Sequence, residues 1–256
     1  ALVGIAATLL WRRSPPSSQS ALSQFWQPVI KSRAAVTVLF GDTTSYYPTG
    51  ETIDALKSQG ETSGPIAGQI FRRTDDEASE GNIRAAFSIT NLLNRTGVNT
   101  QLRWPKETQQ SDLAGANVVY IGAFNNPWTM TLNQNLRFSF AVVNISTKTT
   151  WMIRDNKDPQ QSWSVSAIYP EPITDDFALI TRIFDPNQDR VEVSIGGLNM
   201  FGTQAAGEFL TNEASMASFA RTAPKGWEKR NIQIVLAMKI SEGRVVKPRI
   251  AATAIW

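Results

Sequence analysis

The run Ala35-Val-Thr-Val-Leu-Phe40, followed at once by Gly41-Asp42, decides the fold class of this 256-residue chain. An unbroken run of β-branched and apolar residues is typical of a strand that is buried on both faces, as strands of parallel sheets are. The glycine and aspartate after it mark a loop. Because parallel strands need a crossover between them, the sequence must supply helices in alternation with further strands of this kind.

The segments that follow supply this alternation. Residues 82–96 are predicted to form a helix, because Asn82 can cap its start and Gly97 can end it in a left-handed conformation. The expected apolar face of this helix consists of Ile83, Ala86, Phe87 and Leu93. Predicted strands at 98–103 and 116–122, with a short helical turn between them, complete a βαβαβ order. That order favours a parallel sheet with right-handed crossovers.

The rest of the chain mixes two patterns. Short strand-like pieces separated by turns lie between residues 136 and 184 and predict an antiparallel insertion. A strand at 190–195 and a helix at 203–210 then resume the alternation. Glu192 of that strand is expected on its solvent side.

A long strand at 231–240 leads through a turn to a final strand at 249–256. One face of the long strand carries Ile232, Ile234, Leu236, Met238 and Ile240. Because Asn231, Gln233 and Lys239 fall on the other face, the pattern predicts an antiparallel, partly exposed strand. The complete fold is therefore predicted to be α/β, a three-layer sandwich with a mixed, mainly parallel sheet and a C-terminal antiparallel hairpin.

The chain contains no histidine and no cysteine. This excludes a Ser-His-Asp triad, a His-paired thiol, a thiolate zinc site, a disulfide and a His-ligated haem, and we expect no cofactor and no metal. With 42% hydrophobic and 18% charged residues, the composition is that of a globular protein with a substantial core. The net charge of +3 is small for this length, and basic residues cluster only in pairs. No nucleic acid is therefore expected to bind this chain.

The first residues predict contact with a membrane. Residues 1–11 are apolar almost throughout and are followed by two arginines. A helix of this length spans about 16 Å of a hydrocarbon core of about 30 Å, so 1–13 is interpreted as a partial transmembrane helix or membrane anchor. An amphipathic terminal helix, or one packed on the core, is the alternative. A Ser/Pro linker at 14–24 would lead to a globular α/β domain at 25–256. We expect that domain on the periplasmic side, although arginines after a span favour the cytoplasmic side.

Three loops are expected to meet at one edge of the sheet, because loops after parallel strands gather at its carboxyl edge, where open α/β sheets bind ligands. Their carboxylate, hydroxyl, amide and indole groups suit a small polar ligand such as a sugar or an anion. The candidate ligand-binding residues are Asp42, Thr43, Thr44, Ser45, Asn125, Asn126, Trp128, Asn199 and Thr203. The alternative is that glycine and asparagine serve only the backbone angles of these turns.

The chain resembles uncharacterised acidobacterial membrane proteins in two groups of residues. These are Ile121-Gly-Ala-Phe-Asn-Asn-Pro-Trp128 with Leu136-Arg-Phe-Ser-Phe140, and Gly202-Thr-Gln-Ala-Ala-Gly-Glu-Phe-Leu210 with Trp227 and Asn231. The resemblance covers residues 25–256. It implies an extracytoplasmic α/β domain after one transmembrane helix, often in a protein with a winged-helix DNA-binding domain, and it brings no catalytic residue.

We therefore expect a non-catalytic, membrane-tethered, extracytoplasmic sensor or ligand-binding domain. Its expected partners are the membrane, through the N-terminal segment, and a small polar ligand or a protein. One alternative is a structural subunit of a larger membrane-associated assembly. The other is a carboxylate-dependent hydrolase, for which residues 75–77 and 175–176 supply acidic clusters.

Overall fold

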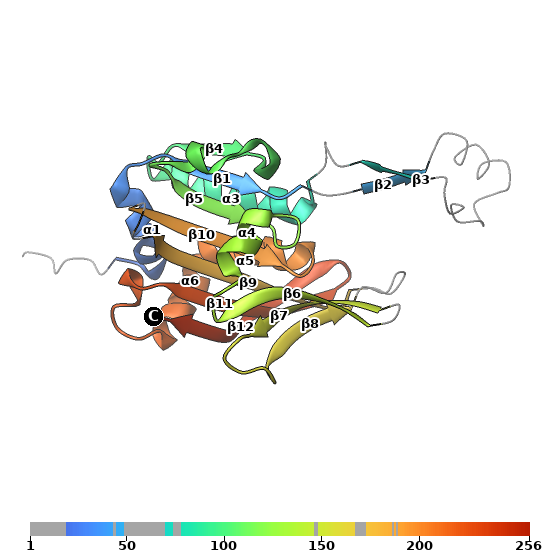
Figure 1. Cartoon of the computed structure of the whole chain (residues 1–256). Helices are drawn as coiled ribbons and strands as arrows, with labels where there is room; N and C mark the ends of the chain where they lie inside the picture. The colour runs from blue at the N-terminus through green and yellow to red at the C-terminus, as the bar shows by residue number, and fades with distance from the viewer. Residues whose placement is uncertain are drawn as a thin grey trace, which may run out of the picture.

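A seven-stranded mixed sheet forms the middle layer of the structure, a computed structural model that describes residues 19–42, 45–48, 70–73, 78–145, 148–166, 173–185, 187 and 189–256. Its strands lie in the order β12-β11-β9-β10-β5-β1-β4 (Figure 1). The bounds are β1 Val36–Phe40, β4 Thr100–Arg103, β5 Asn117–Ile121, β9 Asp175–Asp185, β10 Arg190–Gly197, β11 Ile232–Ser241 and β12 Arg244–Ile255.

The pairing of neighbouring strands changes once across this sheet, from parallel to antiparallel. β4, β1, β5 and β10 are parallel to one another, whereas β10, β9, β11 and β12 pair antiparallel. The hairpin between β11 and β12 turns at Glu242 and Gly243, which both have positive φ as a two-residue hairpin loop requires. The predicted α/β class with a mixed sheet and a C-terminal antiparallel hairpin is confirmed.

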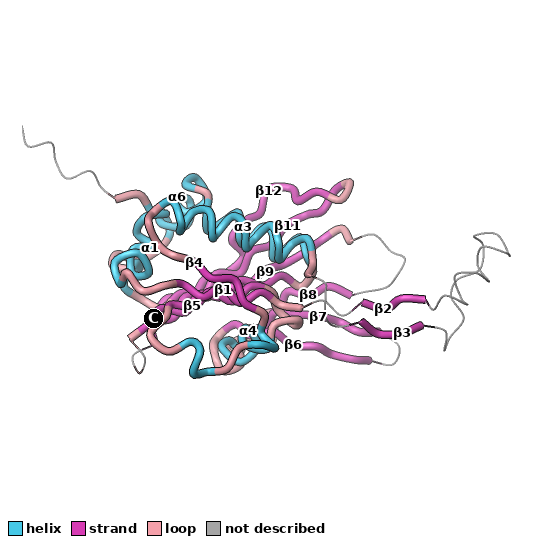
Figure 2. The backbone as a smooth tube through the Cα atoms, turned by 90° about the horizontal axis from the view of Figure 1, so that it is seen from above, coloured by secondary structure: helices cyan, strands magenta, loops and turns pink. Residues whose placement is uncertain are grey.

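Helices cover one face of the sheet, and α4 with a second sheet covers the other (Figure 2). The helices are α1 Ala21–Ser32, α3 Glu80–Arg95, α4 Pro127–Asn133, α5 Met200–Thr211 and α6 Glu213–Thr222. The second sheet is antiparallel and consists of β6 Phe138–Ile145, β7 Lys148–Asp155 and β8 Ser162–Ser166. The described strands within residues 136–184, expected as an antiparallel insertion, thus belong to this sheet and to β9. A two-stranded ribbon, β2 Ser45–Pro48 with β3 Ile70–Arg73, projects beyond β1 (Figure 1).

The orientation of α3 differs from the sequence prediction. Ser79 rather than Asn82 caps the helix, and the predicted core residues Ile83 and Phe87 are 53% and 70% exposed. The reason is the close approach of α5, where a Cβ added at Gly207 would lie 2.7 Å from the Cβ of Ala85. A contact this close needs small residues, so α3 turns its alanines toward α5 and the sheet.

The expectation of exposed polar residues was wrong for two central strands. Gln233 of β11 is 0% exposed and Glu192 of β10 is 8% exposed. Lys239 lies on the surface as predicted and forms an ion pair with Asp175. β11 is antiparallel as predicted, but it lies inside the sheet between β9 and β12, and the second sheet covers its polar face.

The N-terminal boundary also differs from the expectation. α1 begins at Ala21 with Ser20 as its cap, inside the stretch 14–24 that was expected to be a linker. Within the described residues no helix has the length and apolar character needed to cross a bilayer. Residues 1–13, the predicted anchor, lie outside the described part of the chain.

Candidate functional site

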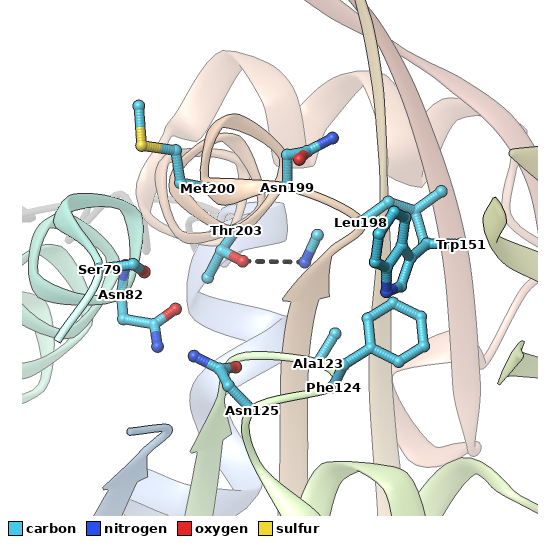
Figure 3. A pocket seen from close by; sticks show the side chains of 11 residues that line it. Ser79, Asn82, Ala123, Phe124, Asn125, Trp151, Leu198, Asn199, Met200 and Thr203 are labelled. Carbon is cyan, nitrogen blue, oxygen red and sulfur yellow. Dashed lines mark hydrogen bonds between the residues drawn. The ribbon is translucent and has the colours of Figure 1, made fainter. Parts of the chain in front are cut away.

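A cleft of about 320 Å³ opens at the carboxyl edge of the parallel strands. It lies between the loops after β5 and β10, the first turns of α3 and α5, and strand β7 (Figure 3). Its lining consists of Ser79, Asn82, Ala123, Phe124, Asn125, Trp151, Gly197, Leu198, Asn199, Met200 and Thr203. None of these side chains is charged.

Close backbone contacts bring the predicted loops together at this edge. A Cβ at Gly41, directly after β1, would lie 2.5 Å from the backbone oxygen of Asn125, so only glycine lets these loops touch. The side chain of Asn82 in α3 donates a hydrogen bond of 3.0 Å to the Gly41 carbonyl oxygen. The turns near Asp42, Asn125 and Asn199 therefore lie along one rim, as predicted from the crossover pattern.

One wall of the cleft is apolar. Phe124, Leu198 and Trp151 pack against the cluster between the two sheets, and Figure 3 shows them side by side. Phe124 packs edge-on against Phe140, with 5.5 Å between the ring centroids. Since Trp151 comes from β7, the second sheet supplies one side of a site whose remainder lies at the edge of the main sheet.

The opposite wall presents amides and hydroxyls. Asn82 and Asn125 point toward one another from α3 and from the loop after β5 (Figure 3). No described residue forms a hydrogen bond with the Asn125 amide or with the indole N–H of Trp151. Thr203 is buried, and its hydroxyl accepts a hydrogen bond of 2.9 Å from the backbone N–H of Gly197. The free amide of Asn125 offers both a donor and an acceptor to a ligand.

The buried carboxylate of Asp176, in β9, binds the first turn of α5 beside the cleft. Asp176 accepts hydrogen bonds from the backbone N–H groups of Gly202, at 2.6 Å, and Asn199, at 3.0 Å. Burial raises the pKa of Asp176 to about 6, and these hydrogen bonds limit the rise. At neutral pH the positive end of α5 therefore already has an anion from the chain itself.

The first turn of α3 is satisfied in a similar way. The hydroxyl of Ser79 accepts a hydrogen bond from the backbone N–H of Asn82, and the acidic Glu80 lies in the first turn. Opposite charges are attracted to a helix N-terminus, so Glu80 offsets the partial positive charge there. The two helix ends that border the cleft thus do not favour an anionic ligand.

The structure places only part of the predicted site in the cleft. Asn125, Asn199 and Thr203 line it, whereas Asp42 does not. Thr43 and Thr44 lie outside the described residues, as does the side chain of Ser45, which begins β2.

Asn126 and Trp128 lie away from the cleft. The buried side chain of Asn126 accepts hydrogen bonds from the first turn of α4 and donates to the carbonyl oxygens of Leu39 and Ile121. Trp128 stacks on Tyr120, with 6.3 Å between the ring centroids, in the cluster under α4. The alternative reading, in which asparagine serves the turn itself, therefore holds for Asn126.

Sequence reasoning missed several residues that line the cleft. Ser79 and Asn82 could have been found from helix capping, because the N-terminus of a helix after a parallel strand faces the same edge as the loops. Trp151 carried no such signal, because its place depends on how the second sheet packs against the first.

The acidic clusters do not contribute to the cleft. Asp175 forms an ion pair of 2.6 Å with Lys239, which lowers the pKa of Asp175, and Asp176 is bound to α5. Residues 75–77 lie outside the described residues. Within the described ranges, acidic side chains form no cluster of three that could hold a metal ion.

The fold and the cleft define an α/β domain with a mixed sheet and an uncharged hollow at the carboxyl edge of its parallel strands. Neither a scan against models of protein families nor a search of curated proteins returned a match to this chain.

Proposed function

We propose that this domain binds a neutral small molecule that bears hydroxyl groups on one side and an apolar surface on the other, such as a sugar ring. The single observation that carries the proposal is the division of the cleft into an apolar wall with Trp151 and an amide wall with Asn125, without a charged side chain. Ligand pockets combine apolar contact area with a few polar groups that fix orientation.

The dimensions and the free polar groups of the cleft support this class of ligand. A volume of about 320 Å³ lies at the lower end of the range for small-molecule sites, which suits one or two rings. The aromatic wall can contact the apolar face of a ring, and Asn125 can exchange a pair of hydrogen bonds with neighbouring hydroxyls. An anion would meet Asp176 close to the first turn of α5, so the site favours a neutral molecule.

The proposal places this binding in a membrane-tethered, extracytoplasmic sensor, as the apolar N-terminal segment of the sequence suggests. A structural subunit would use the same exposed edge for a protein partner. The hydrolase alternative has no carboxylate among the described residues that line the cleft. The occupied state of the cleft is expected to differ little from the empty state, because its walls belong to packed strands and helices.

Ligand-observed NMR with neutral sugars tests this proposal. Glucose, galactose and N-acetylglucosamine are the probes, with glucuronate and glucosamine as charged counterparts. We expect a neutral sugar to bind with a Kd on the order of millimolar and the charged forms to bind several-fold more weakly. Asn125→Ala and Trp151→Ala should each weaken binding about tenfold or more. Stronger binding of glucuronate than of any neutral sugar would overturn the proposal.

Substitutions outside the cleft provide the controls. Trp128→Phe removes an indole on the other side of the loop after β5, and Asp42→Ala removes a carboxylate from the same rim. Because neither residue lines the cleft, both variants should bind the sugar as the unsubstituted protein does. Loss of binding in the Asp42→Ala variant would place the ligand on the rim near β1 instead.

A further inference from the structure

A second hollow lies near the C-terminal end of α5, between α6 and the edge strand β12. Its volume is about 750 Å³, more than twice that of the cleft. Small residues of α6, among them Ala214, Ala217 and Ser218, line one side, and residues 247–250 of β12 line the other. We call this hollow the α6–β12 groove.

All the charged residues that line this groove are basic. Arg221 of α6 and Lys247 and Arg249 of β12 line it, and no acidic residue does. None of these cations forms an ion pair or a hydrogen bond with a described residue. Three unpaired cations therefore border one hollow in a chain whose formal net charge is only +3. Two carboxylates lie on neighbouring positions without lining the groove: Glu208, which borders the adjoining hollow and accepts a hydrogen bond from Gln204, and Glu213 in the first turn of α6.

Protection of the sheet edge explains only part of this pattern. β12 ends the sheet, and its pairing with β11 has irregularities near Val235 and Ala237. Lysine, proline and bulges are common devices that keep an edge strand from pairing with another chain, and Lys247 and Pro248 fit that role. Arg221 does not, because it lies on a helix. The same irregularities and Pro248 prevent a partner from extending the sheet by regular pairing, so side chains must carry any recognition.

The spacing of the cations suits an extended acidic chain. Lys247 and Arg249 are two residues apart on β12, which corresponds to at most about 6.6 Å because the strand has a register shift between Val246 and Arg249. An extended peptide with acidic side chains at alternate positions repeats at the same distance. Arg221 faces them across the groove from α6. Since the groove is hollow rather than flat, it fits a single peptide chain better than a membrane surface.

We infer that the α6–β12 groove binds an acidic, extended peptide segment of a partner protein through Arg221, Lys247 and Arg249. The groove and the cleft share no lining residue, so this interaction is independent of the sugar site. Opposite charges raise the association rate and the specificity of such an encounter, and both fall as salt rises.

Fluorescence anisotropy with a labelled peptide of about eight residues, alternating Glu and Ser, tests the inference. The comparison peptide alternates Gln and Ser. We expect binding of the acidic peptide at about 0.05 M salt, a loss of about tenfold or more at about 0.5 M salt, and little binding of the Gln peptide. Equal binding of both peptides would overturn the inference, because charge would then not determine recognition.

The combined variant Arg221→Gln, Lys247→Gln and Arg249→Gln should weaken binding of the acidic peptide about tenfold or more. A charge-matched control carries Lys31→Gln, Arg95→Gln and Lys157→Gln, which are exposed cations on other elements. The control should bind the peptide as the unsubstituted protein does. An equal loss in both variants would show that net charge, not the groove, attracts the peptide.

Two other anions distinguish the peptide from alternative ligands. Inorganic phosphate and vesicles with anionic lipid are titrated under the same conditions. Phosphate that displaces the peptide at micromolar concentration, or vesicles that bind while the peptide does not, would overturn the assignment to a protein partner. Thermal unfolding of both combined variants verifies that each is folded.

Discussion

The two faces of the seven-stranded sheet are both buried, but they are buried by different chemistry. The face under α1, α3, α5 and α6 is lined by aliphatic residues that alternate along each strand, such as Val36 and Val38 in β1. The face toward α4 and the second sheet carries polar residues as well. These include Thr37, Tyr120, Glu192, Ser194, Thr181 and Gln233.

Hydrogen bonds between layers are added to the apolar contacts on the second face. Gln233 accepts from the backbone N–H of Phe138 at 2.9 Å and donates to its carbonyl oxygen at 2.8 Å, so a side chain joins the two sheets. Asn133 of α4 accepts from Thr181 at 2.6 Å and donates to Ser194 at 3.0 Å. The polar face is thus buried because its groups satisfy one another, not because they are apolar.

Among the described residues, the helix-covered face has two charged exceptions, which lie toward opposite ends of β9. Asp176 is bound to the start of α5. Arg182 is 0% exposed and donates to carbonyl oxygens of two separate segments, α1 and residues 227–230. Its acceptors are the carbonyl oxygens of Phe25, Trp227, Glu228 and Arg230. Each exception therefore connects β9 to a neighbouring segment.

The largest expected effect follows removal of Arg182. Arg182→Met leaves buried carbonyl oxygens without donors and should lower the free energy of unfolding by about 3–5 kcal/mol. The matched control is Arg230→Gln, because Arg230 contributes only its backbone carbonyl to this contact. Urea denaturation should show a change within about 0.5 kcal/mol for the control. If Arg182→Met were as stable as the unsubstituted protein, the hydrogen bonds of Arg182 would not contribute to holding β9 against the neighbouring segments.

The second effect is a pH dependence that Asp176 contributes. Because its pKa is raised from 3.8 to about 6, the folded state favours the protonated carboxyl. The stabilisation is complete below about pH 4 and is lost as pH rises through about 6, a difference of about 3 kcal/mol. Asp176→Asn should remove this dependence, measured as the difference in unfolding free energy from the unsubstituted protein at pH 4 and pH 7.

The neighbouring Asp175 provides a control of opposite sign. Its ion pair with Lys239 lowers its pKa, so its contribution is present at neutral pH and is lost as pH falls below the ordinary value. The difference between the unsubstituted protein and Asp175→Asn should therefore decrease on acidification. If both variants changed in the same direction, burial would not be what distinguishes the two carboxyls.

The contrast between the faces also shows what the sequence can predict. Alternation of apolar residues gave the strands and the face under the helices, because hydrophobic burial leaves a periodic trace. Gln233 and Glu192 alternate with apolar residues in the sequence just as exposed residues would. Whether such a polar side chain meets water depends on the layer that packs on its face of the sheet. Glu192 accepts a hydrogen bond from Tyr120 of the neighbouring strand β5, and no spacing in the sequence connects these two residues.

The same limit applied to the cleft. Parallel order and loop chemistry predicted that Asn125 and Asn199 would lie at one edge. They could not predict that Asn126 turns into the sheet while Asn125 points into the cleft, because adjacent amides are equivalent in sequence. Nor could they predict that Trp151 lines the cleft, because Trp151 belongs to the second sheet.

A matched pair of substitutions compares the two faces of β11 directly. Gln233→Leu keeps a similar volume but leaves the N–H and carbonyl of Phe138 unpaired, so we expect a loss of about 2 kcal/mol. Ile234→Val on the helix-covered face removes one methylene and should cost about 1 kcal/mol. Equal stability of Gln233→Leu and the unsubstituted protein would mean that apolar contact can replace the polar connection between the sheets.

The smallest expected effect concerns the cleft, where the Asn125 amide has no hydrogen-bond partner among the described residues. Asn125→Ala removes an amide that no described residue binds, so the free energy of unfolding should change by less than about 0.5 kcal/mol. Asn126→Ala, one residue further on, loses the α4 cap and two buried hydrogen bonds and should cost about 2 kcal/mol. Urea denaturation measures both. A stability loss in Asn125→Ala as large as that in Asn126→Ala would place Asn125 in the scaffold, whereas an unchanged stability leaves its amide available to a ligand.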